Sequence, residues 1–427
     1  MAKVKIGVFG AGRGTTMMNQ LYEHPDAELV AVCDKYVPAL EEVRKTAEEK
    51  GAKVTLYERF EDFIRHDMDA VVLANYATEH AVYAVKCLNA GKHVMSEVLP
   101  CENIAQGIEL IEAVERTGLV YTYAENYCYM DRTFEMWRRY KNGDIGEATY
   151  GEGEYIHDCL AIWPLVTYGE RDHWRNRIHP FFYCTHSLGP LMAMTGLRPV
   201  KVTGFGAPPD YASRMLGLGL SPGSIEMVEM ENGAVFKSIH GGLKREPGSI
   251  NYELYGKKGC METQRYGKEN LNVWMEGDKA CEGTLETYIP EKFIEKEMAS
   301  RECGHDGSDF YATHFFVQKI LGRPQGEWAI DVYQAVSMGI CGILAYRSFM
   351  NGGVPEAVPD LRDPAQRDKY RNDRACTTPE AAGDQLIPMY PGEDKLPPVP
   401  DEAYERVRRI WEADQHYENE EQLRNLF

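Results

Sequence analysis

A glycine-rich turn between an apolar strand and a helix constrains the fold most strongly. The run Gly10-Ala11-Gly12-Arg13-Gly14-Thr15 follows the strand-like segment Lys5–Gly10 and precedes a helical pattern. Glycines at such a turn let backbone N–H groups approach a pyrophosphate at the helix N-terminus. In the G-x-G-x-x-G pattern the third glycine would fall at Thr15, whereas Gly14 comes one position early. The turn therefore predicts a dinucleotide-binding Rossmann domain with altered glycine spacing.

An acidic residue at the end of the second predicted strand indicates which dinucleotide binds. Asp34 lies 24 positions after Gly10, close to the distance of about 20 residues at which a carboxylate binds the ribose hydroxyls. This favours NAD, while Lys35 and Arg13 could meet a 2′-phosphate and keep NADP as the alternative. A purely structural glycine turn is the other alternative. The order of strand, turn, helix, strand and acid argues against it.

Up to about residue 120 the chain alternates short apolar runs with helical patterns. Apolar residues three and four apart predict helices at Val37–Lys50 and Thr78–Ala90. The predicted strands are Lys5–Gly10, Leu29–Asp34, Ala70–Asn75, His93–Glu97 and Val120–Glu125. This alternation is typical of β-α-β units and predicts an α/β domain with a doubly wound parallel sheet.

After residue 145 the pattern changes to strands separated by turn residues, followed by helices. An Asn232-Gly233 pair predicts a hairpin, and helices are expected at Asp309–Leu321, Ile330–Met350 and Asp401–Trp411. The predicted strands are Tyr150–His157, Val200–Gly206, Ile225–Met230, Ala234–Ile239 and Asn251–Tyr255. We therefore predict an α+β domain with a mostly antiparallel open sheet. The predicted domains are residues 1–126, 127–360 and a C-terminal extension, 361–427.

Composition narrows the class of protein. The 427 residues carry a net charge of −19, which repels phosphate backbones and anionic lipids and argues against nucleic-acid and membrane partners. The eleven cysteines contain no C-x-x-C pair, so we expect reduced thiols and no structural metal. The N-terminus shows no signal-peptide pattern. We therefore expect a cytoplasmic enzyme.

Two blocks near the end of the predicted Rossmann domain carry a family resemblance. Ala74–His80 and Ala90–Glu97 resemble the Gfo/Idh/MocA family of sugar and inositol dehydrogenases. The resemblance implies that Asn75, Tyr76, His80 and Glu97 bind the cofactor. That family typically continues with E-K-P, whose lysine serves in catalysis, but Val98 follows Glu97 here. Because valine cannot accept a proton, either another base substitutes or the chain is not a working dehydrogenase.

Four further blocks point to a particular branch of this superfamily. Glu125–Tyr129, Gly151–Asp158, Trp174-Arg175 and Tyr183–Pro190 resemble the NAD-dependent α-N-acetylgalactosaminidases, which also lack the lysine. The resemblance implies that the sugar is oxidised at C3 with bound NAD, which acidifies the C2 proton and lets the C1 substituent leave. Water then adds and the hydride returns. NAD is recycled, and the net reaction is glycoside hydrolysis.

The resemblance also assigns roles to individual residues. Tyr155 and His157 lie two apart on a predicted strand and share a face, and they are assigned to proton transfer near C2 and C3. His186 and Tyr183 are assigned to hydroxyl binding or activation, and Glu125 to acid/base chemistry or sugar anchoring. The expected substrate contacts are Trp174, Arg175 and His305.

Two local interpretations accompany these roles. The Gly189-Pro190 pair predicts a tight bend that holds the preceding helix start. His305 opens a His305–Asp309 run similar to the family's H-G-G-S-D, in which Ser308 or Asp309 could equally be a helix N-cap.

The leading hypothesis is an NAD-dependent enzyme that acts on a small sugar or glycoside. The first alternative is an ordinary NAD(P)-dependent sugar or polyol dehydrogenase in which a histidine replaces the lost lysine. The second is a non-catalytic nucleotide-binding protein. By resemblance we also expect a homo-oligomer, either a dimer or a tetramer.

Overall fold

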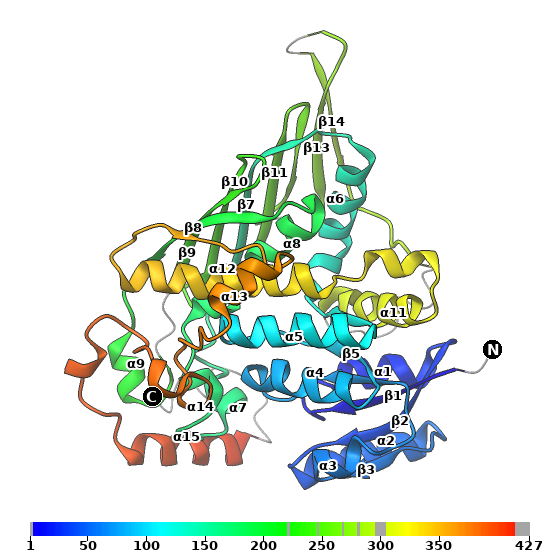
Figure 1. Cartoon of the computed structure of the whole chain (residues 1–427), viewed down its shortest axis with the longest axis vertical. Helices are drawn as coiled ribbons and strands as arrows, with labels where there is room; N and C mark the ends of the chain where they lie inside the picture. The colour runs from blue at the N-terminus through cyan, green and yellow to red at the C-terminus, as the bar shows by residue number, and fades with distance from the viewer. Residues whose placement is uncertain are drawn as a thin grey trace.

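A six-stranded parallel sheet with helices on both faces forms the N-terminal part of the protein (Figure 1). The computed structural model describes residues 3–219, 223–245, 247–266, 269–279, 282–294 and 305–414. The strands are β1 (Val4–Phe9), β2 (Ala27–Cys33), β3 (Thr55–Tyr57), β4 (Ala70–Leu73), β5 (His93–Ser96) and β6 (Tyr121–Tyr123). The helices are α1 (Thr15–Glu23), α2 (Val37–Glu49), α3 (Phe60–Phe63), α4 (His80–Asn89) and α5 (Ile104–Thr117).

The strand order identifies this domain. The order β3-β2-β1-β4-β5-β6, with every pair parallel, is that of a doubly wound dinucleotide-binding sheet. The predicted parallel α/β domain is confirmed, with strand ends shifted by at most two residues. The three-residue strand Thr55–Tyr57 was not predicted, because so short a run carries no periodicity.

A nine-stranded, mostly antiparallel sheet forms the second domain. Its order is β14-β13-β12-β11-β7-β10-β9-β8-β15, and only the β7–β10 pair is parallel among the described pairings. The strands are β7 (Ala148–Ile156), β8 (Pro199–Gly206), β9 (Gly223–Met230), β10 (Val235–Gly241), β11 (Ser249–Gly256), β12 (Gly259–Thr263), β13 (Leu271–Glu276), β14 (Gly283–Tyr288) and β15 (Glu356–Ala357). The predicted sheet and the Asn232-Gly233 hairpin are confirmed, and Gly233 has a φ of 84°.

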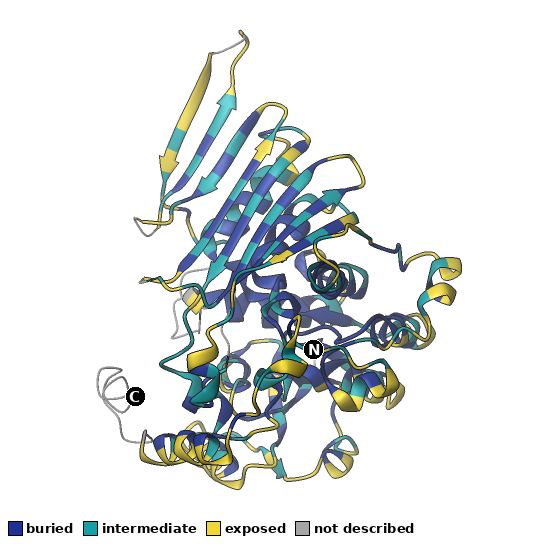
Figure 2. Ribbon diagram, turned by 90° about the vertical axis from the view of Figure 1, so that its left-hand side faces the viewer, coloured by how far each residue is buried: buried dark blue, intermediate teal, exposed yellow. Residues whose placement is uncertain are grey.

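Helices separate this sheet from the Rossmann domain (Figure 1). They are α6 (Asp131–Asn142), α8 (Thr185–Thr195), α11 (Ser308–Ile320) and α12 (Val332–Met350). The shorter α7 (Trp163–Thr167) and α9 (Tyr211–Met215) lie at the lower left of Figure 1. Along strands such as β9, buried and half-exposed residues alternate (Figure 2), as expected for a sheet with one covered face. The core therefore extends from the Rossmann sheet through these helices to the covered face of the large sheet.

The chain then turns back toward the Rossmann domain. After α13 (Pro364–Tyr370), the C-terminal segment, defined here as residues 379–414, contains α14 (Pro379–Ala382) and α15 (Asp401–Asp414). Helix α15 packs beside α7 through the buried side chains of Ala403, Val407 and Ile410. In Figure 1 it crosses the lower edge of the molecule, next to the Rossmann domain.

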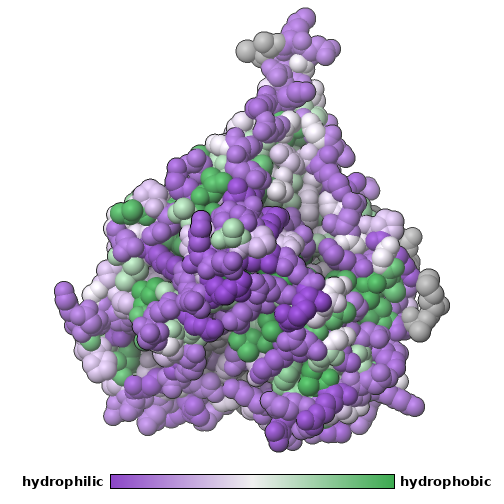
Figure 3. Space-filling model, viewed as in Figure 1, coloured by the Kyte–Doolittle hydropathy of each residue, from purple (hydrophilic) through white to green (hydrophobic). Residues whose placement is uncertain are grey.

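One helical stretch in the described part of the chain is long and apolar enough to cross a membrane. It spans Pro324–Met350, has a mean hydropathy of 1.4 and is 78% buried inside the protein. Burial to this extent is typical of a core helix, and α12 packs against α5 and α8. The face of the molecule seen in Figure 3 is predominantly hydrophilic.

Candidate active site

The glycine turn has the shape that a dinucleotide requires. Gly10 has a φ of 104°, and an added Cβ there would lie 2.3 Å from the Ala74 carbonyl oxygen. A Cβ on Gly14 would lie 2.2 Å from the Gly10 carbonyl oxygen, so both glycines are needed for chain packing. A Cβ on Gly12 would meet nothing within 4 Å. Gly12 therefore borders open space at the start of α1, where a pyrophosphate would meet backbone N–H groups.

Asp34 lies beside this turn at the end of β2. Its Oδ2 accepts a hydrogen bond from the Ala11 N–H at 2.7 Å, and its Oδ1 accepts one from the Tyr36 N–H at 2.8 Å. Each oxygen keeps lone pairs for a further donor. The carboxylate is thus fixed next to the glycine turn, which fits the ribose of NAD.

The other predicted cofactor residues follow neighbouring strands at the same sheet edge. Asn75 and Tyr76 come directly after β4, and Thr15 begins α1, where its hydroxyl donates to the Ala11 carbonyl at 2.6 Å. His80 is buried, with Nε2 3.2 Å from the Asn75 carbonyl oxygen, and burial lowers its pKa to about 4. The predicted set is therefore brought together along one edge.

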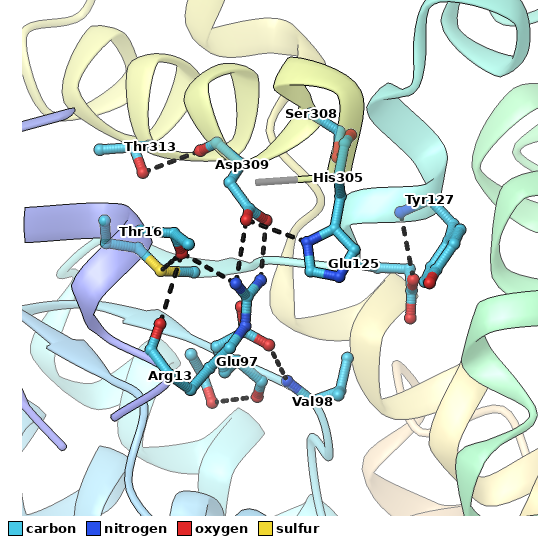
Figure 4. Close-up of polar contacts among 12 residues, drawn as sticks. Arg13, Thr16, Glu97, Val98, Glu125, Tyr127, His305, Ser308, Asp309 and Thr313 are labelled. Atoms are coloured by element: carbon cyan, nitrogen blue, oxygen red, sulfur yellow. Dashed lines mark hydrogen bonds and ion pairs between the residues drawn. The ribbon is translucent and has the colours of Figure 1, made fainter. Parts of the chain in front are cut away.

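The Arg13 side chain points toward Asp309 at the start of α11 (Figure 4). Its guanidinium binds Asp309 through two contacts of 2.9 and 2.7 Å, and it contacts Glu97 Oε1 at 2.6 Å. Asp309 also lies 3.1 Å from His305 Nδ1. Arg13 therefore links the nucleotide-binding turn, the end of β5 and the start of α11.

The N-cap interpretation of Ser308 and Asp309 is wrong. The N-cap of α11 is Gly307, which has a φ of 92°, and no side chain caps the helix. Asp309 is fully buried and uses both oxygens on Arg13 and His305. Burial opposes its ionisation, but the hydrogen bonds from His305 and Arg13 outweigh burial and hold the pKa of Asp309 well below its usual range. Burial raises the pKa of Glu97, with Arg13 acting in the opposite direction.

A buried carboxylate–imidazole pair forms the centre of the site. Glu125 Oε1 lies 2.8 Å from His186 Nδ1, and both side chains are buried. The other oxygen, Glu125 Oε2, is buried and lacks a hydrogen-bond partner within the described structure. Since buried polar atoms are normally paired, this oxygen is a candidate acceptor for a ligand hydroxyl group. The imidazole is oriented by a carboxylate, as in many general acid–base pairs.

A second pair lies next to the first. The Tyr155 hydroxyl is 3.1 Å from His157 Nδ1, and the Tyr155 and His186 ring centres are 4.9 Å apart. Tyr183 lies 5.2 Å from His186, and burial raises the pKa of both tyrosines. The five predicted catalytic residues therefore meet in one cluster.

The predicted substrate residues border this cluster. Trp174 stacks on Tyr183 with ring centres 5.9 Å apart, and the Arg175 guanidinium lies 4.3 Å from the centre of the Trp174 ring. His305 reaches the other side, 6.0 Å from the Tyr127 ring. All three predicted residues therefore lie around the same site.

Local features of α8 fix His186. The tight bend predicted at Gly189-Pro190 is wrong, because both residues lie inside the helix. Pro190 has no N–H for the His186 carbonyl, and the Tyr252 hydroxyl donates to that carbonyl at 2.5 Å instead. A Cβ on Gly189 would lie 3.3 Å from the Glu125 side chain. Gly189 thus leaves room for the Glu125 side chain. Pro190 leaves the His186 carbonyl available to accept the hydrogen bond from Tyr252 on β11.

Sequence reasoning missed several residues of the site. His240 on β10 is 4% exposed and stacks on Tyr155 with ring centres 5.0 Å apart. Burial, aided by His186, lowers its pKa well below the usual value. The alternation Phe236, Ser238, His240 already places His240 on the buried face of its strand. Asp309 and Tyr252 gave no such signal, since their partners lie far away in the sequence.

A cavity of about 190 Å³ opens beside the cluster. Tyr155, His157, Tyr183, Arg175 and His240 are among the residues that line it. Val98 is only 6% exposed and belongs to the hydrophobic core, so the position of the family lysine offers no proton acceptor. Within the described ranges, no group of His, Cys, Asp and Glu could hold a metal ion.

Comparisons with known proteins agree with this geometry. Residues 4–125 match the family described as "Oxidoreductase family, NAD-binding Rossmann fold", and residues 224–366 match "Glycosyl hydrolase 109, C-terminal domain". A "Glycosyl hydrolase family 109 protein" of Saccharopolyspora erythraea is 25% identical over 389 residues, which cover 84% of this chain and 83% of that protein. The protein of that name from Streptomyces coelicolor is 26% identical over 405 residues, covering 86% and 84%.

Solved structures share the fold. Levoglucosan dehydrogenase in complex with NADH and L-sorbose has a TM-score of 0.67 at 17% identity, covering 84% of this chain and all of that one. The apo scyllo-inositol dehydrogenase from Lactobacillus casei has a TM-score of 0.62 at 18% identity, covering 84% and 98%.

Fold and site together define a two-domain, NAD-binding enzyme of the oxidoreductase type. Its N-terminal part matches the Gfo/Idh/MocA Rossmann domain, and its second part matches the C-terminal domain of glycosyl hydrolase 109 proteins. The resemblance predicted from the sequence is confirmed.

Proposed function

We propose that the protein is a glycosidase that uses NAD as a recycled catalyst on a small sugar glycoside. The observation that carries this proposal is that two acid–base couples, Glu125–His186 and Tyr155–His157, lie side by side, with the Tyr155 and His186 ring centres 4.9 Å apart. A simple dehydrogenase moves one proton, that of the oxidised hydroxyl. Hydrolysis through a ketone must also remove and return the proton on the neighbouring carbon, so two couples fit it better.

The chain's residues divide this work as follows. When bound, NAD would supply a hydride acceptor that converts one ring hydroxyl to a ketone and later gives the hydride back. Tyr155 relays the hydroxyl proton to His157, giving up its own proton to Nδ1 as it takes that of the sugar. His186, oriented by Glu125, removes the acidified C2 proton and passes it to the leaving oxygen as the C1–oxygen bond breaks. Water then gives its hydroxyl group to C1 and, through His186, its proton to C2, and the Tyr155–His157 couple returns the hydroxyl proton, so the net reaction is hydrolysis.

The second candidate is an ordinary sugar dehydrogenase. The Tyr155–His157 couple alone could take the single proton that this reaction releases, in place of the missing lysine. In that case Glu125 and His186 would only bind hydroxyl groups.

Hydrogen exchange separates the two candidates. The purified protein is denatured to identify the retained nucleotide, and intact enzyme is then incubated with aryl glycosides in D₂O. The glycosidase releases aglycone without net NADH and leaves one deuterium at C2 of the product sugar. Steady NADH accumulation without deuterium at C2 identifies the dehydrogenase. If neither the wild type nor His186→Ala turns over any glycoside of the panel, the protein is instead a non-catalytic nucleotide-binding protein.

We also propose that the protein is a cytoplasmic homo-oligomer. The nine cysteines in the described ranges are all free, which suits a reducing compartment. The large sheet has one face not covered by the helices of Figure 1, as a dimer interface would require. Light scattering coupled to gel filtration gives the oligomeric state directly.

A further inference from the structure

The C-terminal segment supplies part of the cavity wall. Met389, Tyr390, Glu393 and Tyr404 line the same cavity as Tyr155 and His157. They follow the cluster by more than 200 positions in the sequence. The segment also lies outside both family matches, which end at residue 366. This wall is therefore not part of the shared two-domain fold.

The segment is held firmly against the second domain. Arg214 donates to the Pro397 carbonyl at 2.9 Å, Arg171 forms an ion pair with Asp401, and the Tyr346 hydroxyl donates to the Pro388 carbonyl. A Cβ on Gly169 would lie 2.4 Å from the Arg408 backbone nitrogen, so only glycine admits α15 at this distance. Tyr390 is only 2% exposed. The wall is thus fixed in place.

The chemistry of this wall suits a ring with polar substituents. Tyr404 and Trp163 offer aromatic faces, while Glu393 and Arg214 offer an acceptor and a donor for hydroxyl groups. The Tyr155–His157 couple lines the same cavity. A glycoside that reacts beside this couple therefore extends into the space that the C-terminal segment borders.

We propose that the C-terminal segment forms a subsite for the leaving group and that this subsite takes one ring, with Tyr404 and Glu393 as its recognition residues. The inference rests on the proposed function, which places the reacting sugar beside Tyr155 and His157. The cavity of about 190 Å³ is below the roughly 300–1,000 Å³ of pockets for drug-sized ligands. The wall therefore limits the substrate to a short glycoside rather than a polymer chain.

Binding measurements test this subsite without requiring turnover. The NAD-loaded protein is titrated calorimetrically with matched methyl and 4-nitrophenyl glycosides of galactose, glucose and their N-acetylamino analogues, and with a disaccharide of each sugar. We expect the ring-bearing ligands to bind about tenfold more tightly than the methyl glycoside of the preferred sugar. If only the 4-nitrophenyl glycoside binds more tightly than the methyl glycoside, the subsite takes an aryl leaving group. If the disaccharide binds more tightly, the subsite takes a second sugar.

Three variants test which residues of the C-terminal segment cause the tighter binding of ring-bearing ligands. Tyr404→Ala should abolish the gain from the ring while methyl glycoside affinity stays within about twofold. Glu393→Gln removes the charge but keeps an acceptor for the Met389 N–H, which the carboxylate now binds at 2.6 Å. It should weaken disaccharide binding selectively. Arg406→Ala, on the exposed side of the same helix, is the control and should bind every ligand like the wild type.

Two results would overturn the inference. The first is a wild-type protein that binds no ring-bearing glycoside more tightly than the methyl glycoside. The second is a Tyr404→Ala variant that loses affinity equally for both ligands. Aglycone release does not enter these measurements, so a protein that binds glycosides selectively without cleaving them would refute the proposed function and leave the subsite standing.

Discussion

Replacing Asp309 by asparagine tests the ion pair that joins the two domains. The Asp309 side chain is fully buried and that of Arg13 is 29% exposed. Removing one partner of a buried pair costs about 3–5 kcal/mol. Here the loss is smaller, because Glu97 remains 2.6 Å from Arg13 and asparagine keeps one acceptor. We expect Asp309→Asn to lower the free energy of unfolding by about 2–3 kcal/mol at pH 7.

The sign of the pH dependence follows from the lowered pKa of Asp309. A carboxyl whose pKa is lower in the folded state stabilises the fold above its unfolded pKa of about 3.9, and this contribution is lost as the pH falls below that value. The difference between wild type and Asp309→Asn is therefore full at pH 7 and shrinks below pH ~4. Urea denaturation followed by circular dichroism at several pH values measures it.

A matched control lies at the other end of α11. Arg323 binds Asp26 through contacts of 2.6 and 3.0 Å, but both side chains are partly exposed. Because exposed ion pairs contribute little, Asp26→Asn should destabilise the protein much less than Asp309→Asn. Equal losses in the two variants, or a difference from wild type that grows as the pH falls, would refute the reasoning.

Three further variants test the site. Glu125→Gln should lower turnover by about 10²–10⁴-fold because His186 loses its charged partner, and unchanged steady-state rates would rule out its acid–base role. Tyr252→Phe leaves the buried His186 carbonyl unpaired and should cost about 1–3 kcal/mol of unfolding free energy, measured by urea denaturation; no loss would show that the carbonyl finds another donor. Asp34→Ala should weaken NAD binding about 10–100-fold in calorimetry, and an unchanged Kd would place the ribose elsewhere.

Local patterns in the sequence predicted the Rossmann domain because its strands and helices have distinct periods. The glycine turn and Asp34 are close enough in the sequence for their spacing to indicate a dinucleotide site. Glu125, Tyr155 and His186 could be named only through the family resemblance, since no spacing brings three separate elements to one point. Their meeting is a product of the tertiary structure.

The two wrong local predictions, the helix cap and the bend, also result from tertiary contacts that local sequence does not show. Asp309 looks like a helix cap because Asp is common at that position, but Arg13, almost 300 positions earlier, provides a stronger partner. Gly189-Pro190 looks like a bend because proline removes a helical hydrogen bond, yet Tyr252 replaces that bond from a strand. The cavity wall formed by Tyr404 carries no local signal at all.

Helix α15 carries a tryptophan, Trp411, whose fluorescence is placed to report on ligand binding. Trp411 lies with its ring centre 6.2 Å from that of Tyr36 and 5.3 Å from that of Tyr168. Tyr36 follows Asp34, the residue predicted to bind the ribose, by two positions, and Trp411 belongs to the same helix as Tyr404. The intrinsic fluorescence of this indole is therefore placed to respond both to cofactor and to glycoside, and Trp411→Phe would isolate its share of the emission.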